Sequence, residues 1–317
     1  MARDAALMTI PIILDCDPGH DDAIALLLAL ASPEIEVVGV TTVAGNSSLA
    51  KTTANALKVL ELVERAEIPV AAGAPRPLVR DLVVGEYVHG ESGLDGPQLP
   101  APSQRPVSQH AVDFMAERIL SHSEPITLVP VGPLTNVALL LNRFPEVADR
   151  LERIVSMGGA IGTGNITPAA EFNIYVDPEA ALRVYHSGIP ITMIGLEVTH
   201  RALLDRDHAE QLRAMGRAGR FVAELLDFYL GHHPRHFAGG EGVPIHDAVA
   251  VAALVWPDLV KTEQCHVTVE TQSDLCRGRT VVDRWRVTDQ APNAAVGVDL
   301  DGQRFAELLI DRIASLG

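Results

Sequence analysis

Four aspartates within eight residues form the densest group of chemically active side chains in the sequence: Asp15, Asp17, Asp21 and Asp22. A β-branched run precedes the group and an Ala- and Leu-rich stretch follows it to residue 31, which predicts a strand, an acidic loop and a helix. Like charges this close repel one another unless a cation or hydrogen bonds compensate them. The group therefore favours a metal site.

A structural role accounts for only part of this group. Asp21 and Asp22 suit the first turn of a helix, where the helix dipole favours negative charge, but Asp15 and Asp17 stand at the end of a buried strand. The ligands on offer are oxygen atoms, which favours a hard cation and leaves calcium and magnesium open. Because the spacing does not match an EF-hand loop, ligands from elsewhere must complete the shell.

A candidate for the missing ligand is Asp247, which opens a predicted helix after Val243-Pro-Ile. His246 beside it is a candidate general acid, because the pKa of imidazole is the one nearest neutrality. A His-Asp pair at a helix start also serves as a cap and its neighbour. The residues alone leave both interpretations open.

Two polar groups suit a sugar. Asn46 follows Gly45, and the run 165–173 ends in Glu171-Phe-Asn173. Amides and carboxylates can pair with vicinal hydroxyls, which need partners once they are buried. Gly-Asn is also a common turn, so either group alone is a weak signal.

The order of predicted elements indicates an α/β fold. Strands and helices alternate from residue 10 onward, which implies parallel βαβ units in an open, mostly parallel sheet flanked by helices, Rossmann-like, with the site at the carboxyl ends of the strands. We expect no regular structure in the Pro- and Gly-rich segment 73–106, one long helical region over 205–229, and short strands near the end. With 317 residues, 47% of them hydrophobic, and no linker or repeat, the sequence predicts a single domain, 1–317.

The charge and the cysteines narrow the class of protein. A formal net charge of −16 argues against nucleic acid and membrane surfaces as partners. The three cysteines, Cys16, Cys265 and Cys276, lack a CxxC spacing and indicate free thiols in a reducing compartment. Since the start does not look like a signal peptide and no apolar stretch reaches membrane-spanning length, we expect a cytoplasmic protein.

Seven motifs in order, from residue 10 to about residue 255, make the chain resemble the inosine-uridine-preferring nucleoside hydrolase family. They are Asp15-Cys-Asp-Pro-Gly-His-Asp-Asp-Ala, Thr42-Val-Ala-Gly-Asn46, His89-Gly-Glu-Ser-Gly93, Leu128-Val-Pro-Val-Gly-Pro-Leu-Thr-Asn136, Met157-Gly-Gly, Ala170-Glu-Phe-Asn173 and His246-Asp247. The first motif is highly specific. The resemblance implies hydrolysis of the N-glycosidic bond of ribonucleosides to ribose and free base.

The resemblance also implies a calcium ion and a set of roles. The ion would be bound by Asp17, Asp22, the backbone carbonyl of Val131 and Asp247, and Asp17 would take the proton of a calcium-bound water that attacks the anomeric carbon. Such a reaction builds an oxocarbenium-like centre, which an anionic pocket stabilises. The implied substrate contacts are Asp21, Asn46 and Asn173 at the 2′- and 3′-hydroxyls, Asn165 and Glu171 at the 5′-hydroxyl, His89, Met157 and Phe172 in the pocket wall, and His246 at the departing base.

The region around the base departs from the family pattern. Tyr229 stands where the family often has an aromatic residue, but the next turn offers His232, His233 and His236 in place of a second Tyr. His233 fits either a leaving-group acid or one of several exposed histidines in a flap over 231–242. The preferred base therefore stays open among uracil, cytosine and hypoxanthine. A homo-oligomer, tetramer or dimer, is a family expectation.

Three other functions fit less well. An aspartyl phosphotransferase would explain Asp15-Cys-Asp17, but Pro18-Gly19 follows and no partner Lys with a later acidic pair is evident. A catalytically weak ribose- or nucleoside-binding protein is disfavoured because Asp17 and His246 are both present. A phosphorylase needs a cationic phosphate pocket, which this acidic group does not offer.

Overall fold

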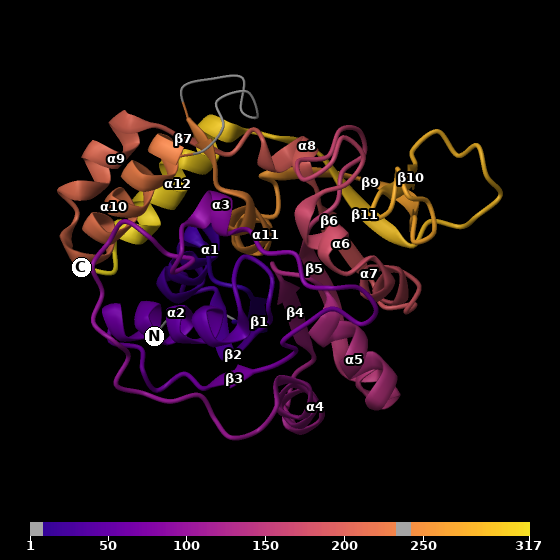
Figure 1. Ribbon diagram of the computed structural model, residues 1–317, viewed down its shortest axis with the longest axis horizontal. Coiled ribbons are helices and arrows are strands. Elements are labelled where there is room, and N and C mark those ends of the chain that lie inside the picture. Colours follow the sequence, from indigo (N-terminus) through magenta and orange to yellow (C-terminus); the bar gives the residue numbers. More distant parts are fainter. Residues whose placement is uncertain (1–8, 233–241) are drawn as a thin grey trace, which may run out of the picture.

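A nine-stranded sheet runs through the computed structural model, which describes residues 9–232 and 242–317 (Figure 1). The strand order is β10-β9-β11-β6-β5-β4-β1-β2-β3. The strands are β1 (Ile10–Cys16), β2 (Ile35–Thr42), β3 (Val70–Ala72), β4 (Ile126–Pro130), β5 (Leu151–Met157), β6 (Ile191–Ile194), β9 (Val260–Val269), β10 (Thr280–Asp283) and β11 (Ala294–Leu300), while β7 (Leu203–Leu204) and β8 (Val243–Pro244) form a separate ribbon.

The sheet is mixed, with a parallel part that carries the site. β3, β2, β1, β4, β5, β6 and β11 pair in parallel, and β9 pairs antiparallel with β11 and β10. The chain moves outward from β1 through β2 to β3 and then returns to place β4 on the other side of β1. The loops after β1 and β4 therefore diverge at a topological switch point, where open α/β sheets bind ligands. This confirms the predicted α/β class.

Helices cover both faces of the sheet (Figure 1). They are α1 (His20–Ala31), α2 (Leu49–Leu62), α3 (Glu86–His89), α4 (Ala111–Ser121), α5 (Thr135–Arg143), α6 (Phe172–Val176), α7 (Pro178–Tyr185), α8 (Leu196–Thr199), α9 (Arg206–Arg213), α10 (Gly216–His232), α11 (His246–Val255) and α12 (Gly302–Ala314). One core cluster joins one face of the sheet to α1, α2, α10, α11 and α12, and a second joins the other face to α4, α5 and α7.

Successive side chains of β1 pack into the two core clusters in turn. Ile12 and Leu14 pack in the first cluster, and Ile13 packs in the second, as the two-residue period of a strand requires. The following helix, α1, is buried along almost its whole length because α2, α10, α11 and α12 surround it. A helix that is apolar all round is expected in such a position. Its first-turn acids, Asp21 and Asp22, are consequently buried as well.

Two predicted segments were wrong in detail. The helical region expected over 205–229 is two helices, α9 and α10, because Gly216 adopts a left-handed φ of 69° that turns the chain between them. The segment 73–106 contains the short helix α3, and the last part of the chain contains a ten-residue strand, β9. These elements depend on packing against distant parts of the chain, which local periodicity does not report.

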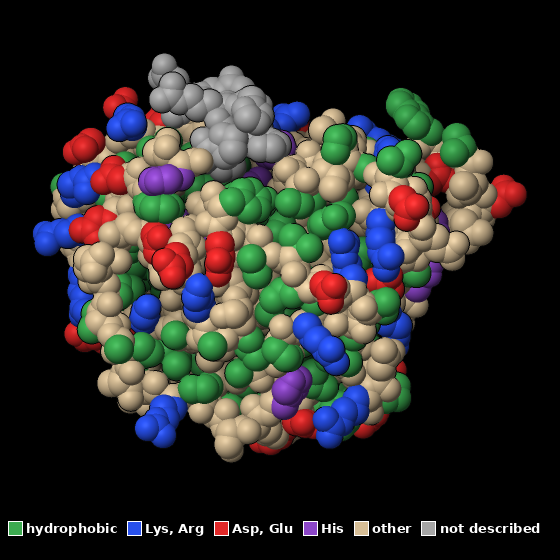
Figure 2. All heavy atoms as spheres, in the orientation of Figure 1, with side chains coloured by type: hydrophobic (Ala, Val, Ile, Leu, Met, Phe, Trp, Pro, Cys, Tyr) green, Lys and Arg blue, Asp and Glu red, His purple; other side chains and the backbone are tan. Residues whose placement is uncertain are grey.

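Charged side chains of both signs are spread over the visible surface. On the face shown in Figure 2, Lys and Arg side chains are scattered among acidic and apolar ones and do not gather into a basic patch. In the described parts of the chain, no helix has the length and apolar character needed to cross a membrane. Cys16, Cys265 and Cys276 are free thiols, as predicted.

Candidate functional site

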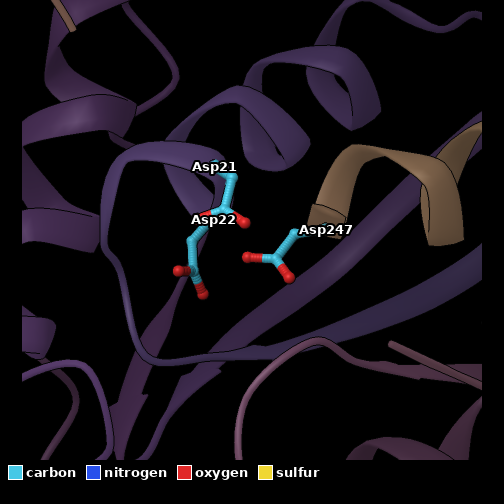
Figure 3. A group of neighbouring side chains, drawn as sticks. All are labelled: Asp21, Asp22 and Asp247. Carbon is cyan, nitrogen blue, oxygen red and sulfur yellow. The ribbon is translucent and has the colours of Figure 1, made fainter. Parts of the chain in front are cut away.

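Three carboxylates from two distant parts of the chain converge at the carboxyl edge of the sheet. Asp21 and Asp22 lie in the first turn of α1, and Asp247 lies in the first turn of α11, with its carboxylate directed toward the other two (Figure 3). Oxygen atoms of all three lie within 4.8 Å of one another. The contact between α1 and α11 thus joins the two motifs that the sequence separates by more than two hundred residues.

Asp17 lies beside this group, directly after the end of β1. Its Oδ2 accepts the backbone N–H of Asn46 at 2.6 Å, whereas its Oδ1 is buried and has no hydrogen-bond partner among residues 9–232 and 242–317. The carboxylate of Asp22 accepts the backbone N–H groups of Asp17 at 3.0 Å and Gly19 at 2.9 Å. The loop is therefore folded around Asp22, and one oxygen of Asp17 is left for a ligand.

Two glycines permit this close packing around Asp17. A Cβ at Gly45 would collide with Oδ2 of Asp17, and a Cβ at Gly132 would collide with Oδ1. Gly45 follows β2 and Gly132 follows β4, so the loops after three neighbouring strands meet at one carboxylate. Backbone can approach a side chain this closely only where glycine stands.

Burial and mutual repulsion raise the pKa values of these carboxyls. Desolvation is the largest cause for each, and it raises the pKa of Asp17 and of Asp247 well above the usual range. The pKa of Asp21 rises to about 7, through burial and then the charge of Asp22, although backbone amides of His246 and Asp247 oppose the rise. Among the described residues, no Lys or Arg forms a salt bridge with the group.

The donor set fits a divalent metal ion. All of its side-chain ligands are buried carboxylate oxygens, one of which, Oδ1 of Asp17, lacks a described partner. A hard cation prefers such oxygens and would compensate charges that are otherwise too costly to bury. The three carboxylates that lie closest together are those of Asp21, Asp22 and Asp247, and Asp17 adjoins them. The resemblance does not name Asp21 as a metal ligand, but its carboxylate belongs to this group.

Asp15 differs from the other three acids of the sequence group. Its Oδ1 accepts from Oγ1 of Thr41 at 2.6 Å and from Nδ2 of Asn136 at 2.8 Å, within the sheet. Burial raises its pKa to about 7, and these two hydrogen bonds oppose that rise. Asp15 therefore links β1 to β2 and to α5 through hydrogen bonds.

A pocket opens beside the carboxylates. Most of the residues predicted to contact substrate line it: Asp21, Asn46, His89, Met157, Asn165, Glu171, Phe172, Asn173, Tyr229 and His246, together with the predicted ligands Val131 and Asp247. Asp17 and Asp22 are buried and are not among the residues that line it. His233 lies outside the described residues. Gly85, Tyr87 and Val88 also line the pocket and were missed, although the last two directly precede the His89 motif.

Local hydrogen bonds fix the polar residues on the far side of the pocket. Glu171 caps α6 and accepts backbone N–H groups of Gly159 at 2.9 Å and Asn173 at 2.9 Å, and burial raises its pKa to about 7. Nδ2 of Asn173 donates to the carbonyl of Val131 at 2.7 Å. That carbonyl keeps a second lone pair, so the contact is compatible with its predicted role as a ligand.

His246 begins α11 and reaches the pocket wall. Its side chain is buried, and its Nδ1 lies 2.8 Å from Oγ1 of Thr199 in α8. A hydrogen bond at Nδ1 orients the imidazole and leaves Nε2 as its other polar atom. The position agrees with the prediction that a helix starts at this residue and brings it to the same edge as Asp17.

With divalent cations removed by a chelator, we expect the free energy of unfolding to fall as the pH rises from about 4 to about 7. The pKa values of Asp15, Asp21 and Glu171 rise from 3.8, 3.8 and 4.5 to about 7 in the folded protein. Between the two pKa values the folded state holds protons that the unfolded chain has released. The stability that these three groups contribute is therefore fully present below about pH 4 and is lost as the pH rises through about 7. Melting temperatures measured in chelator across this range test it, and a rise with pH would contradict it.

Comparisons with known proteins agree with this geometry. Residues 12–307 match the family described as inosine-uridine preferring nucleoside hydrolase. The chain is 53% identical to the pyrimidine-specific ribonucleoside hydrolase RihA of Shigella boydii, covering 96% of this chain and 99% of that one, and 54% identical to RihA of a Shewanella species, covering 97% of each. Among solved structures, the purine-preferring ribonucleoside hydrolase from Gardnerella vaginalis superposes with a TM-score of 0.91 at 35% identity, covering 96% of this chain and 98% of that one.

Proposed function

Since the chain belongs to the inosine-uridine preferring nucleoside hydrolase family and hydrolyses ribonucleosides to ribose and free base, we propose that it does so with a calcium ion held by its buried carboxylates. The observation that carries the proposal is the convergence of Asp21, Asp22 and Asp247 beside Asp17, buried and without a salt bridge to a described Lys or Arg. Asp17, Asp22, Asp247 and the carbonyl of Val131 would hold the ion. Calcium, when bound, would lower the pKa of water and of the carboxyls around it and would attract sugar hydroxyls.

Asp17 is the general base of the proposed reaction. Its Oδ2 is held by the N–H of Asn46, and its Oδ1 has no described partner, so Oδ1 is the atom available to take a proton from the attacking water. Glycines at 45 and 132 prevent side chains from covering either oxygen. Water attacks the anomeric carbon of the ribose as the bond to the base breaks, and the negative pocket stabilises the positive charge that develops on the sugar.

Polar side chains around the carboxylates bind the ribose. The family resemblance assigns Asp21, Asn46 and Asn173 to the 2′- and 3′-hydroxyls, and all three line the pocket. The same resemblance assigns Asn165 and Glu171, which also line the pocket, to the 5′-hydroxyl. Buried amides and carboxylates of this kind reject sugars that leave them without partners, which would favour ribose over deoxyribose.

The base lies against the histidine and aromatic side of the pocket in this proposal. His246 would protonate the departing base, since its imidazole lines the pocket and is oriented by Thr199. His89, Phe172 and Tyr229 would pack against the base, with Met157 completing the wall. His233 remains a second candidate acid, on its place in the sequence alone.

We expect uridine and cytidine to exceed inosine in kcat/KM by about tenfold or more. The expectation rests on the RihA relatives, which are named as pyrimidine-specific and share 53–54% identity with the chain, against 35% for the purine-preferring structure. Steady-state rates with the three nucleosides measure the ratio. An inosine rate equal to or above that of uridine would show that the pocket has diverged from these relatives.

Base release from a panel of ribonucleosides in phosphate-free buffer tests the function as a whole. Chromatography should detect free base and ribose from uridine without added phosphate. Release only after phosphate addition would indicate a phosphorylase, and binding without release would indicate a silent nucleoside-binding protein. We also propose a homo-oligomer, on the family resemblance, and a cytoplasmic location, which three free cysteines support.

A further inference from the structure

His20 is a buried histidine that contacts two pocket residues without lining the pocket itself. It is the first residue of α1, directly before Asp21, and its side chain is fully buried. Its neighbours include His89 and Tyr229, both of which line the pocket. Polar side chains at such a depth are costly unless each nitrogen has a partner, so the contacts of His20 indicate what the residue does.

One nitrogen of His20 is directed at His89. Nδ1 of His20 lies 3.0 Å from Nδ1 of His89. A neutral imidazole has a single N–H, which in His20 is on Nε2 and faces the carbonyl of Asp95, so Nδ1 of His20 accepts the N–H on Nδ1 of His89. The two rings are stacked, with centroids 5.3 Å apart. A Cβ at Gly19 would lie 2.7 Å from Nδ1 of His89, so glycine before His20 is needed for this approach.

The other nitrogen anchors His20 to the turn that follows His89. Nε2 donates to the carbonyl of Asp95 at 2.8 Å, and the carboxylate of Asp95 in turn accepts the backbone N–H groups of Glu91 at 3.0 Å and Ser92 at 3.2 Å. The turn after α3, the helix that ends at His89, is thereby tied to the first turn of α1, which contains Asp21 and Asp22.

Aromatic rings of α10 fix the plane of the imidazole. Phe228 stacks on His20 with centroids 5.2 Å apart and planes 9° apart, and Tyr229 follows at 5.5 Å and 23°. His20 therefore links three separate segments: α1, the end of α3 with the turn that follows it, and the end of α10. Contacts at Nδ1, at Nε2 and on the ring plane hold the imidazole of His20 in one orientation, so the ring can fix the position of the side chains that it contacts.

We propose that His20 is a positioning residue for nucleoside binding, which orients His89 in the pocket wall through the contact between their Nδ1 atoms. The inference rests on the proposed function and adds a residue to it. Because the orientation of His89 is set before substrate arrives, less ordering accompanies binding, and the loss of His20 should appear mainly in KM.

Two substitutions separate the contacts of His20. In His20→Asn the side-chain amide lies near the position of Nδ1 and can keep the contact to His89, whereas in His20→Gln it lies near the position of Nε2 and can keep the contact to Asp95. Both lose the ring that stacks on Phe228, so each is a matched control for the other. We expect His20→Gln to raise KM for uridine about tenfold with kcat little changed, and His20→Asn to have the smaller effect. Equal effects, or the larger effect for Asn, would overturn the proposal.

A double-mutant cycle with His89→Ala distinguishes positioning from a general structural role. If His20 acts through His89, then His20→Gln adds no further increase in KM in the His89→Ala background. An undiminished increase there, or a KM effect that merely follows the melting temperature, would overturn the proposal.

Base release by the parent chain, measured first, decides the proposed function separately. If the parent binds uridine without cleaving it, the same cycle is run on the dissociation constant of uridine, and the same coupling is expected. A parent that neither cleaves nor binds uridine refutes both inferences.

Discussion

Replacing Asp17 by Asn is expected to reduce kcat for uridine by roughly a thousandfold or more, while the protein remains folded. Asn has the same shape and can keep an oxygen on the N–H of Asn46, but it lacks the basic oxygen that would accept a proton from water. The fold should tolerate the change, because it removes a buried carboxyl whose ionised form is opposed by desolvation and by Asp22. Uracil release and the melting temperature of the purified variant are the two measurements.

Asp15→Asn is the matched control for this experiment. Asp15 is equally buried and only two residues away, but its Oδ1 accepts hydrogen bonds from Thr41 and Asn136 within the fold. We expect it to change kcat by less than about tenfold, since Asp15 takes no part in proton transfer. If Asp17→Asn retained a kcat within tenfold of the parent, the base would have to be another residue.

Replacing Asp247 by Asn is expected to raise the calcium concentration needed for half-maximal activity by about a hundredfold or more. The substitution removes one of the three converging carboxylates and so weakens attraction for a cation without changing the shape of the site. The loss of rate at low calcium should be largely reversed at high calcium. Rates measured over a calcium titration of chelator-treated protein give both values.

A buried carboxylate outside the group provides the control for Asp247. Asp177 caps α7, accepts from Oγ1 of Thr135 at 2.6 Å and has a pKa raised by burial. Asp177→Asn should lower stability and leave the calcium dependence as it is in the parent. Equal calcium dependence in Asp247→Asn and the parent would remove Asp247 from the proposed ligand set.

Local pattern was sufficient to predict the elements that carry the site. The β-branched run before Asp15 is β1, the Ala- and Leu-rich stretch after it is α1, and α11 begins at His246 as expected. These signals are strong because a buried strand or helix constrains each residue along it. The alternation of such elements was enough to predict a parallel sheet with its site at the carboxyl edge.

The part of the site that depends on tertiary contacts was not predictable in the same way. The sequence grouped Asp15 with three other acids, and only the pairing of β1 with β2 and the position of α5 show that Asp15 bonds Thr41 and Asn136. Likewise, no role was predicted for His20 within the first motif, because its contacts with His89 and Phe228 come from segments far along the chain.

The structure also bears on the phosphotransferase alternative. That reading would place Asp15 or Asp17 as a nucleophile toward a phosphate, but Asp15 is engaged within the sheet and Asp17 adjoins three further carboxylates. An approaching phosphate would be repelled by this group, and among the described residues the pocket has no Lys or Arg in its wall to offset that repulsion. The glycosidic bond of a neutral nucleoside carries no such penalty.

The most direct test of the central claim is chromatographic detection of uracil released from uridine in phosphate-free buffer, before and after chelation of divalent cations and again after calcium is restored. The account predicts that release occurs without phosphate, stops on chelation and returns with calcium. Release that continues unchanged after complete removal of the metal would contradict it, because the buried carboxylates would then cleave the bond without a cation.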